Sequence, residues 1–228
     1  IHTLFNFEGI SIFYIIISVL TVFIFFLTAK EVSNKKTALI TLLLIIPLIT
    51  YRTDFRPETF SFLFMGIYLY SLIKQDIKHR QTKFLYLLPL IQLLWVNTHI
   101  FFIIGPGLIV TFIIKNIVSS APKPQIKRLI KYFLLTLLAC LINPNFIDGF
   151  LAPLTIFNEY PYQVAENQSL FFMYNRFKTP IYVHFAALSL LSLSLTLFTV
   201  YTKKRTILFE SIIFFIFVFM SSIFILSS

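Results

Sequence analysis

The sequence has few residues of the kinds that soluble proteins place on their surfaces and in their cross-links. Only 12% of its 228 residues are charged, whereas a soluble domain carries about 25%. A water-soluble fold of this size could not cover its surface with so few charges. Cys140 is the single cysteine, which excludes an internal disulfide and a cluster of thiol metal ligands. Its place inside an apolar run predicts a small buried packing residue.

Apolar and aromatic residues are abundant instead. Hydrophobic residues make up 58% of the chain, with 29 Phe and 11 Tyr, and the mean hydropathy is +0.87. This composition predicts membrane lipid as the main solvent. The net charge of +10 would also suit nucleic acid, but the basic residues form short clusters between apolar runs. That pattern is typical of cytoplasmic loops in membrane proteins, so no nucleic-acid partner is expected.

Eight apolar runs approach the length of about 20 residues that crosses a bilayer. The predicted fold is an all-α, polytopic transmembrane helical bundle in a single domain, residues 1–228, with an outer loop at 143–180. Within that loop, 146–157 is expected to form a short interfacial helix. Pro89 and Gly105-Pro106-Gly107 are expected to kink or break helices. The predicted spans are 10–27, 37–51, 59–73, 84–96, 100–118, 132–142, 181–201 and 207–226, of which the fourth and fifth form either a tight hairpin or one kinked segment.

The basic residues alternate between the connections of this arrangement. Fifteen of the nineteen lie in odd-numbered connections, and the four others are Arg52, Arg56, Arg176 and Lys178. Because positive residues are retained on the cytoplasmic side, the odd connections are predicted to be cytoplasmic and the even ones external.

The first external connection holds alternating charges at a membrane boundary. Arg52, Asp54, Arg56 and Glu58 fall within seven positions, and Pro57 suits the first turn of a following helix. One interpretation is interfacial anchoring with local ion pairs. The other is that an arginine binds a phosphate bidentately while Asp54 or Glu58 orients it or acts as a base.

The second external segment, Trp95-Val96-Asn97-Thr98-His99, ends an apolar run. Trp95 is predicted to anchor the chain at the membrane interface. Near the hydrocarbon, Asn97 and His99 are functional candidates, with His99 as a proton carrier or a hydrogen-bond donor to phosphate. A zinc site would need more ligands than His99 has nearby, and the sequence has no His-x-x-x-His spacing. No cofactor is predicted, and a divalent metal is compatible with the sequence but not indicated by it.

The third external segment begins at Asn143-Pro144 and includes Glu166 and Gln168. Asn-Pro after an apolar run is typical of a helix stop, and Glu166 is either solvated or part of a site. Together the three segments place acidic, basic and amide side chains on one membrane face, as expected for a site at the outer leaflet.

The order of these motifs resembles bacterial members of the GT-C glycosyltransferase superfamily, whose relatives include protein mannosyltransferases and aminoarabinose transferases. The resemblance covers about residues 9–169. Ile100 and Phe146 stand where the family pattern has Gly, and Asn167 stands where it commonly has Trp. The motifs that carry the resemblance are Arg56-Pro57-Glu58, Trp95-x-Asn97-x-His99, Asn143-Pro144 and Glu166-x-x-Ser169.

The resemblance implies a polyprenyl-phosphate-linked sugar donor, such as undecaprenyl phosphate, used on the extracytoplasmic face of the bacterial cytoplasmic membrane. The sugar and the acceptor are not identified. A carboxylate would deprotonate the acceptor and cationic groups would stabilise the leaving phosphate, with inversion at the anomeric carbon. The family's principal catalytic Asp is expected upstream of Ile1. The candidates within the chain are Asp54, Glu58, His99 and Glu166 as catalytic residues, and Arg52, Arg56, Asn97, Asn143 and Gln168 as substrate-binding residues.

Two other functions are compatible with the sequence. A transporter or flippase of a lipid-linked or small anionic solute would place polar residues near the bilayer midplane, often at broken helices. The predicted helices are apolar through their centres, apart from the break at Gly105-Pro106-Gly107, which weighs against transport. A non-catalytic subunit of an envelope-assembly complex would need no convergent site.

Overall fold

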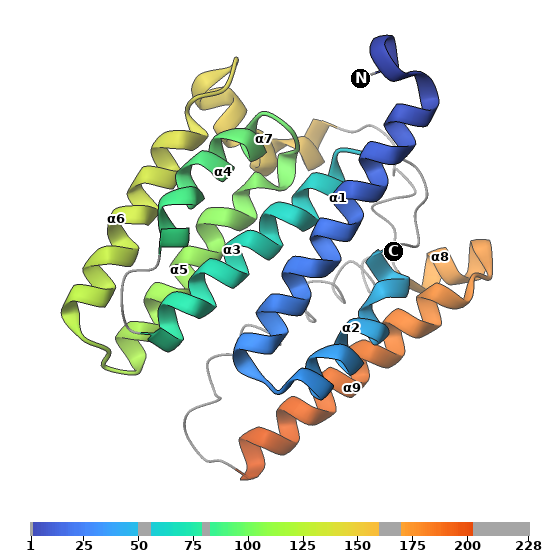
Figure 1. Cartoon of the computed structure of the whole chain (residues 1–228). Coiled ribbons are helices and arrows are strands. Elements are labelled where there is room, and N and C mark those ends of the chain that lie inside the picture. The colour runs from blue at the N-terminus through green and yellow to red at the C-terminus, as the bar shows by residue number, and fades with distance from the viewer. Residues whose placement is uncertain (1, 50–55, 79–82, 160–169, 203–228) are drawn as a thin grey trace. The chain divides into compact units, whose positions relative to one another are not determined.

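All regular structure in the described part of the chain is helical. The computed structural model describes residues 2–49, 56–78, 83–159 and 170–202, and no strand occurs in these ranges (Figure 1). The predicted all-α class is therefore confirmed. The chain divides into two compact units, Ile1–Ile156 and Phe157–Ser228, which we describe separately.

Helices occupy every predicted apolar run within the described residues, and the run at 207–226 lies outside them. Helix α6 starts nine residues before its predicted run, in the basic segment, and α8 lies in the predicted outer loop. Helices α8 and α9 belong to the second unit and contact each other. The elements are α1 (His2–Val32), α2 (Lys35–Ile49), α3 (Glu58–Lys78), η1 (Lys83–Tyr86), α4 (Leu87–Val96), η2 (Ile100–Ile103), α5 (Ile104–Val118), α6 (Lys123–Cys140), α7 (Phe146–Glu159), α8 (Leu170–Phe177) and α9 (Pro180–Thr202).

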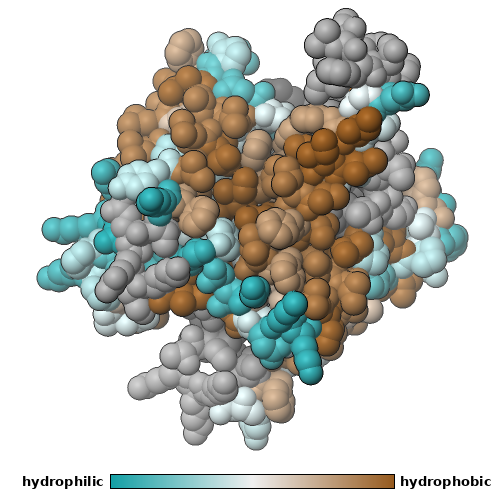
Figure 2. Space-filling view, viewed as in Figure 1, coloured by the Kyte–Doolittle hydropathy of each residue, from teal (hydrophilic) through white to brown (hydrophobic). Residues whose placement is uncertain are grey.

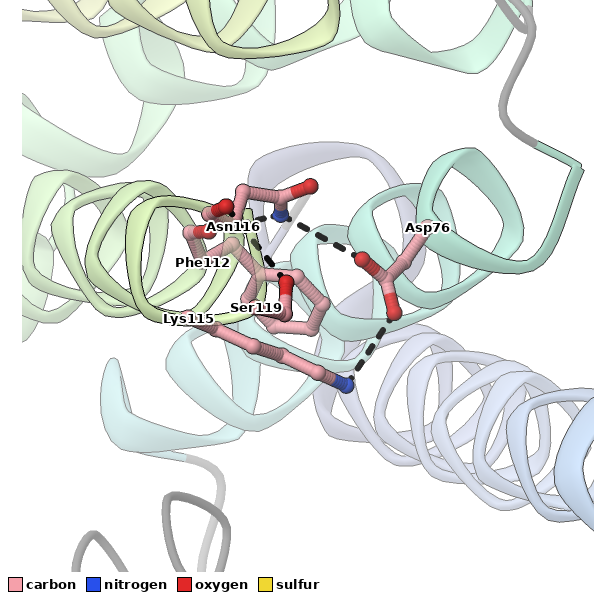
Figure 3. Close-up of polar contacts among 5 residues, drawn as sticks. All are labelled: Asp76, Phe112, Lys115, Asn116 and Ser119. Carbon is pink, nitrogen blue, oxygen red and sulfur yellow. Dashed lines mark hydrogen bonds and ion pairs between the residues drawn. The ribbon is translucent and has the colours of Figure 1, made fainter. Parts of the chain in front are cut away.

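Two ion pairs join the carboxyl ends of three helices in the first unit. Lys74 of α3 lies 3.1 Å from Glu31 of α1. Lys115 of α5 lies 3.0 Å from Asp76 of α3 (Figure 3). We call this the ion-pair end of the bundle. Because the three helices all finish there, α1, α3 and α5 run in the same direction.

The opposite end is formed by the start of α3 and the finish of α4 and α6. Ser61, in the first turns of α3, contacts His99, which follows α4. Asn97, at the end of α4, donates a hydrogen bond to the carbonyl of Ile142, which follows α6. We call this the serine–histidine end. Helices α4 and α6 therefore run opposite to α1, α3 and α5, as the alternation of basic residues requires.

The fourth and fifth runs form a tight hairpin. The backbone of His99 is extended (φ −155°, ψ 145°), which separates α4 from η2. Gln92 of α4 donates a hydrogen bond to the carbonyl of Phe102, ten residues later. Helices α4 and α5 continue through Pro89 and Gly105-Pro106-Gly107, so the expected break is wrong, and the expected kink stays a prediction. Each proline lies in the first turn of its helix, where a proline removes no intrahelical hydrogen bond.

The core of the first unit contains a buried polar network. The sequence predicts helices that are apolar through their centres, so this network is a departure from that prediction. The Tyr68 hydroxyl donates to Gln92 Oε1 at 2.7 Å and contacts the Leu88 carbonyl at 3.0 Å. The Gln92 amide donates to Cys140 Sγ at 3.0 Å. All three side chains are fully buried, which confirms the buried position predicted for Cys140. The network ties α3, α4 and α6 together.

In the part of the chain that the structure describes, two helical stretches are long and apolar enough to cross a bilayer, Glu8–Val32 and Ile100–Val118. The first packs little of its surface, and Figure 2 shows a broad apolar face over α1. Six of its large apolar side chains are 46–60% exposed: Ile12, Ile15, Ile16, Val19, Leu20 and Phe23. The described helices thus include candidate spans, while the predicted number of eight stays a prediction.

Candidate functional site

A chain of hydrogen bonds at the serine–histidine end joins α3, α4 and η2. The indole N–H of Trp95 donates to Ser61 Oγ at 2.8 Å. Ser61 Oγ lies 3.1 Å from Nδ1 of His99. The same nitrogen accepts a hydrogen bond from the backbone N–H of Phe101 at 3.3 Å, which caps η2. Ser61, which is 38 positions away in the sequence, and the two segments that flank His99 therefore fix one imidazole ring.

These contacts select one tautomer of His99. A nitrogen that accepts from the Phe101 N–H carries no proton, so the Ser61 hydroxyl must donate to it. The Trp95 indole satisfies the oxygen of that hydroxyl. The proton of the neutral ring therefore lies on Nε2. His99 at this end is a hydrogen-bond donor through Nε2, rather than a base through Nδ1.

Burial keeps the ring neutral at physiological pH. Desolvation lowers the pKa of His99 below its ordinary value of 6.5, and the nearby negative charge of Glu58 opposes this in part. Glu58 is the first residue of α3, where a carboxylate is stabilised by the helix N-terminus. Ser61 follows it by one turn. Glu58, through its charge, and Ser61, through its hydrogen bond, therefore both act on His99 at the same end of the bundle.

The two predicted asparagines hold the backbone of this end. The Asn97 amide donates to the carbonyls of Leu93 at 2.8 Å and Ile142 at 2.9 Å. Both hydrogens of its NH₂ group are thereby used, and only its oxygen can accept from a ligand.

Asn143 has a similar role between α6 and α7. Its amide donates to the carbonyls of Cys140 and Phe146, both at 2.9 Å, and its oxygen accepts from the N–H of Asn145 at 2.8 Å. Asn143 thus stops α6, as its Asn-Pro sequence predicts, and its amide hydrogens are not available to a substrate.

The other predicted site residues are only partly placed. Arg56 is half-buried directly before α3, and its carbonyl accepts from the N–H of Thr59 at 3.1 Å. It therefore lies two residues before Glu58, on the segment that leads into the site. The remaining predicted residues lie outside the described ranges: Arg52, Asp54, Glu166 and Gln168.

The prediction that Trp95 anchors the chain at the membrane interface is wrong. Its side chain is fully buried, and its ring packs at 5.8 Å from the rings of both Phe64 and Tyr68. Its indole N–H is satisfied by Ser61, so the ring needs no contact with water. Ser61 itself was missed, because a serine one turn into an apolar helix is an unremarkable residue in the sequence. Its i+3 spacing from Glu58 is the only available signal.

The arrangement can bind an anion or a polarised oxygen next to a carboxylate. The Nε2–H of His99 supplies a neutral donor, and Glu58 supplies an acceptor beside it. Among the described residues no group of three His, Cys, Asp or Glu side chains lies close enough together to hold a metal ion. Comparison with protein-family models, curated proteins and solved structures finds no match for this chain.

Proposed function

We propose that the chain is a multi-pass membrane protein of the GT-C glycosyltransferase type. It uses a polyprenyl-phosphate-linked sugar donor on the extracytoplasmic face of a bacterial cytoplasmic membrane. The observation that carries this proposal is the neutral His99 donor beside Glu58, held at one end of an apolar helical bundle. The motif order Arg56-Pro57-Glu58, then Asn97-x-His99, supports the choice of reaction class.

The exposed apolar surface supports the membrane part of the proposal. Removing apolar surface from water stabilises a protein by about 25 cal/mol per Å². A soluble chain with an exposed apolar face such as that of α1 would therefore aggregate to bury it. In lipid the same surface is the favourable one. We infer eight spans with the serine–histidine end outside, because the fifteen basic residues of the odd connections belong at the other end.

The proposed chemistry assigns a binding role to His99. Its Nε2–H donates to an oxygen of the lipid phosphate, and this hydrogen bond strengthens as the phosphate gains charge. The bond between the anomeric carbon and the phosphate oxygen breaks, and its electron pair stays on the phosphate. The acceptor hydroxyl forms the new bond to the anomeric carbon and gives its proton to a carboxylate. Glu58 is the described carboxylate nearest this chemistry, and Arg56 adds positive charge on the same segment.

The buried polar network favours the transferase over the transport alternative. A solute pathway needs polar groups that exchange their partners for the solute. Tyr68, Gln92 and Cys140 carry no charge, and they bond to one another and to the Phe102 carbonyl. They therefore stabilise the bundle as cross-links.

The test is a binding titration on the purified full chain in detergent. An undecaprenyl-phosphate-linked hexose is compared with the neutral undecaprenol. A hydrogen bond to a charged phosphate contributes about 1.5–3 kcal/mol, so His99→Gln should weaken binding of the phosphate-bearing lipid roughly ten- to a hundredfold. Binding of undecaprenol should not change. The matched control is His184→Gln in α9, which should bind as the unchanged protein does. Equal affinity for the two lipids, or no effect of His99→Gln, would contradict the proposal.

Ser61 can be tested separately as the residue that positions His99. Ser61→Ala removes the donor to Nδ1 and should weaken donor-lipid binding less than His99→Gln does. Nitrogen NMR of the labelled imidazole gives a readout that a merely structural defect would not change. The unchanged protein should show an unprotonated Nδ1 and a protonated Nε2, and Ser61→Ala should show a mixture of tautomers. A protonated Nδ1 in the unchanged protein would overturn the assigned role.

A further inference from the structure

Within the described residues, the basic residues of α6 differ from Lys74 of α3 and Lys115 of α5 in lacking acidic partners. Lys74 and Lys115 are each paired with a carboxylate at the ion-pair end. Helix α6 has no acidic residue in its own sequence. Within the described ranges no acidic side chain forms an ion pair with any of its four cations, which are Lys123, Lys127, Arg128 and Lys131.

Three of these cations form a row on the surface of α6. Lys123, Lys127 and Lys131 follow one another at intervals of four residues, and all three are exposed. Side chains at this spacing start about 5–6 Å apart on one helical face, so they repel one another and weaken the helix. An anion between successive lysines would remove that repulsion, and a phosphate group has the size to bridge them.

Arg128 adds a second, independent observation beside this row. Its side chain is half-buried, and its Nη1 atom is buried without a hydrogen-bond partner. A buried charged donor that makes no hydrogen bond is costly to the fold. Nη1 itself has almost no accessible surface, so a phosphate outside the bundle would meet the other guanidinium nitrogens, whose planar fork fits phosphate oxygens.

The same helix becomes apolar immediately after the lysine row. Leu134 and Leu138 of α6, and Ile142 just after its end, are 53–60% exposed. Cationic side chains are therefore followed along α6 by aliphatic ones. A phospholipid has the matching order, with a phosphate above its acyl chains, and lysine stems lie along acyl chains while their amines reach the headgroups.

We propose that the lysine face of α6, which comprises Lys123, Lys127 and Lys131 together with Arg128, binds the headgroups of anionic phospholipids. This rests on the membrane insertion in the proposed function, not on sugar transfer. A net negative headgroup is required because three lysines without an acidic partner among the described residues gather on one face. The face lies on the basic side of the predicted topology, where the leaflet carries anionic lipid.

The experiment measures lipid affinity of the full chain in detergent by the thermal shift that added lipid produces. Short-chain phosphatidylglycerol is compared with phosphatidylcholine of the same acyl length. Each lysine near an anionic headgroup contributes about a fivefold gain in affinity, so Lys123→Gln, Lys127→Gln and Lys131→Gln together should weaken phosphatidylglycerol binding about a hundredfold. Lys30→Gln, Lys35→Gln and Lys36→Gln together are the matched control, because they remove the same charge from exposed positions elsewhere. The control should keep its preference for phosphatidylglycerol.

Three outcomes would overturn the proposal. One is an equal response of the unchanged protein to both lipids. Another is an equal loss in the two triple variants, which would indicate total charge and not a site. The last is an equal shift from inorganic phosphate alone, which would indicate a free-anion site. A fall in phosphatidylglycerol affinity with added salt in the unchanged protein would support it without any variant. Because the readout is lipid binding, failure of the transfer hypothesis leaves this result unaffected.

Discussion

His99 owes its chemistry to neighbours that fix one of its two ring nitrogens. The Ser61 hydroxyl and the Phe101 N–H both hydrogen-bond to Nδ1, and the Trp95 indole N–H donates a hydrogen bond to Ser61 Oγ. A histidine alone in a loop would sample both tautomers and would gain a proton readily. Here the ring is a donor of defined direction, which is the property that binding a phosphate oxygen requires.

The depressed pKa of His99 predicts a stability that depends on pH. As pH falls through 6.5, the unfolded chain binds a proton at this residue before the folded chain does. The folded state therefore loses stability as pH falls. The melting temperature should drop between about pH 7.5 and pH 5.5, and His99→Gln should reduce that drop. His184→Gln is the control, and an unchanged pH dependence in His99→Gln would contradict the prediction.

Gly105 is required by the polar network that crosses the core. A Cβ at this position would overlap Gln92 Oε1 and would lie 3.1 Å from the Tyr68 ring. Gln92 is fully buried and already hydrogen-bonded, so it cannot move away cheaply. Gly105→Ala should destabilise the fold by about 1–3 kcal/mol.

Gly107 provides the control for that substitution. A Cβ there meets nothing within 4 Å, and the position is exposed in the same helix. Gly107→Ala should be neutral or should stabilise by about 0.5–1 kcal/mol. Thermal unfolding in detergent measures both variants, and equal melting temperatures would show that the crowding at Gly105 is relieved without cost.

Between elements, Asp76 ties α3 to α5 through two different bonds. One carboxylate oxygen pairs with Lys115 at 3.0 Å, and the other accepts from the Asn116 amide at 3.3 Å (Figure 3). Asn116 is 1% exposed, and its amide also donates to the Phe112 carbonyl at 2.7 Å. The ion pair is partly exposed and so contributes little, whereas the buried amide needs its acceptor.

Two substitutions at Asp76 separate these contributions. Asp76→Asn keeps an oxygen for Asn116 and loses only the charge, so it should cost about 0–1 kcal/mol. Asp76→Ala removes the acceptor of a buried amide and should cost about 1–3 kcal/mol. Chemical or thermal unfolding in detergent ranks the pair. Equal losses in the two variants would show that the ion pair, which both substitutions remove, outweighs the bond to Asn116.

For the whole molecule, the alternating helix directions predict which connections face each side of a membrane. Cys140 is fully buried, so an introduced cysteine would be labelled against a low background. Asn145→Cys follows α6 at the serine–histidine end, and Ser119→Cys follows α5 at the ion-pair end; both positions are exposed.

In intact cells a membrane-impermeant maleimide should label Asn145→Cys at once and Ser119→Cys only after lysis. The reverse result would invert the proposed orientation. Labelling of both positions from outside would rule out a membrane between the two ends.

The sequence by itself determined the helical class, the approximate positions of the helices and the alternation of their ends. These features depend on local composition, since apolar runs of sufficient length and clusters of lysine are visible without any contact. It also predicted that Glu58, His99 and Asn143 belong to one end, because that follows from the alternation. The roles of these residues remain predictions.

Only the tertiary structure decided how the site is held. The bonds from Ser61 to Trp95 and to His99 join residues 34 and 38 positions apart. The tertiary structure also decided that Trp95 is buried, which its position at the end of an apolar run did not predict. It likewise placed Gly105 beside Gln92. Such contacts depend on how helices pack face to face, and apolar periodicity leaves that packing open because lipid and core accept the same side chains.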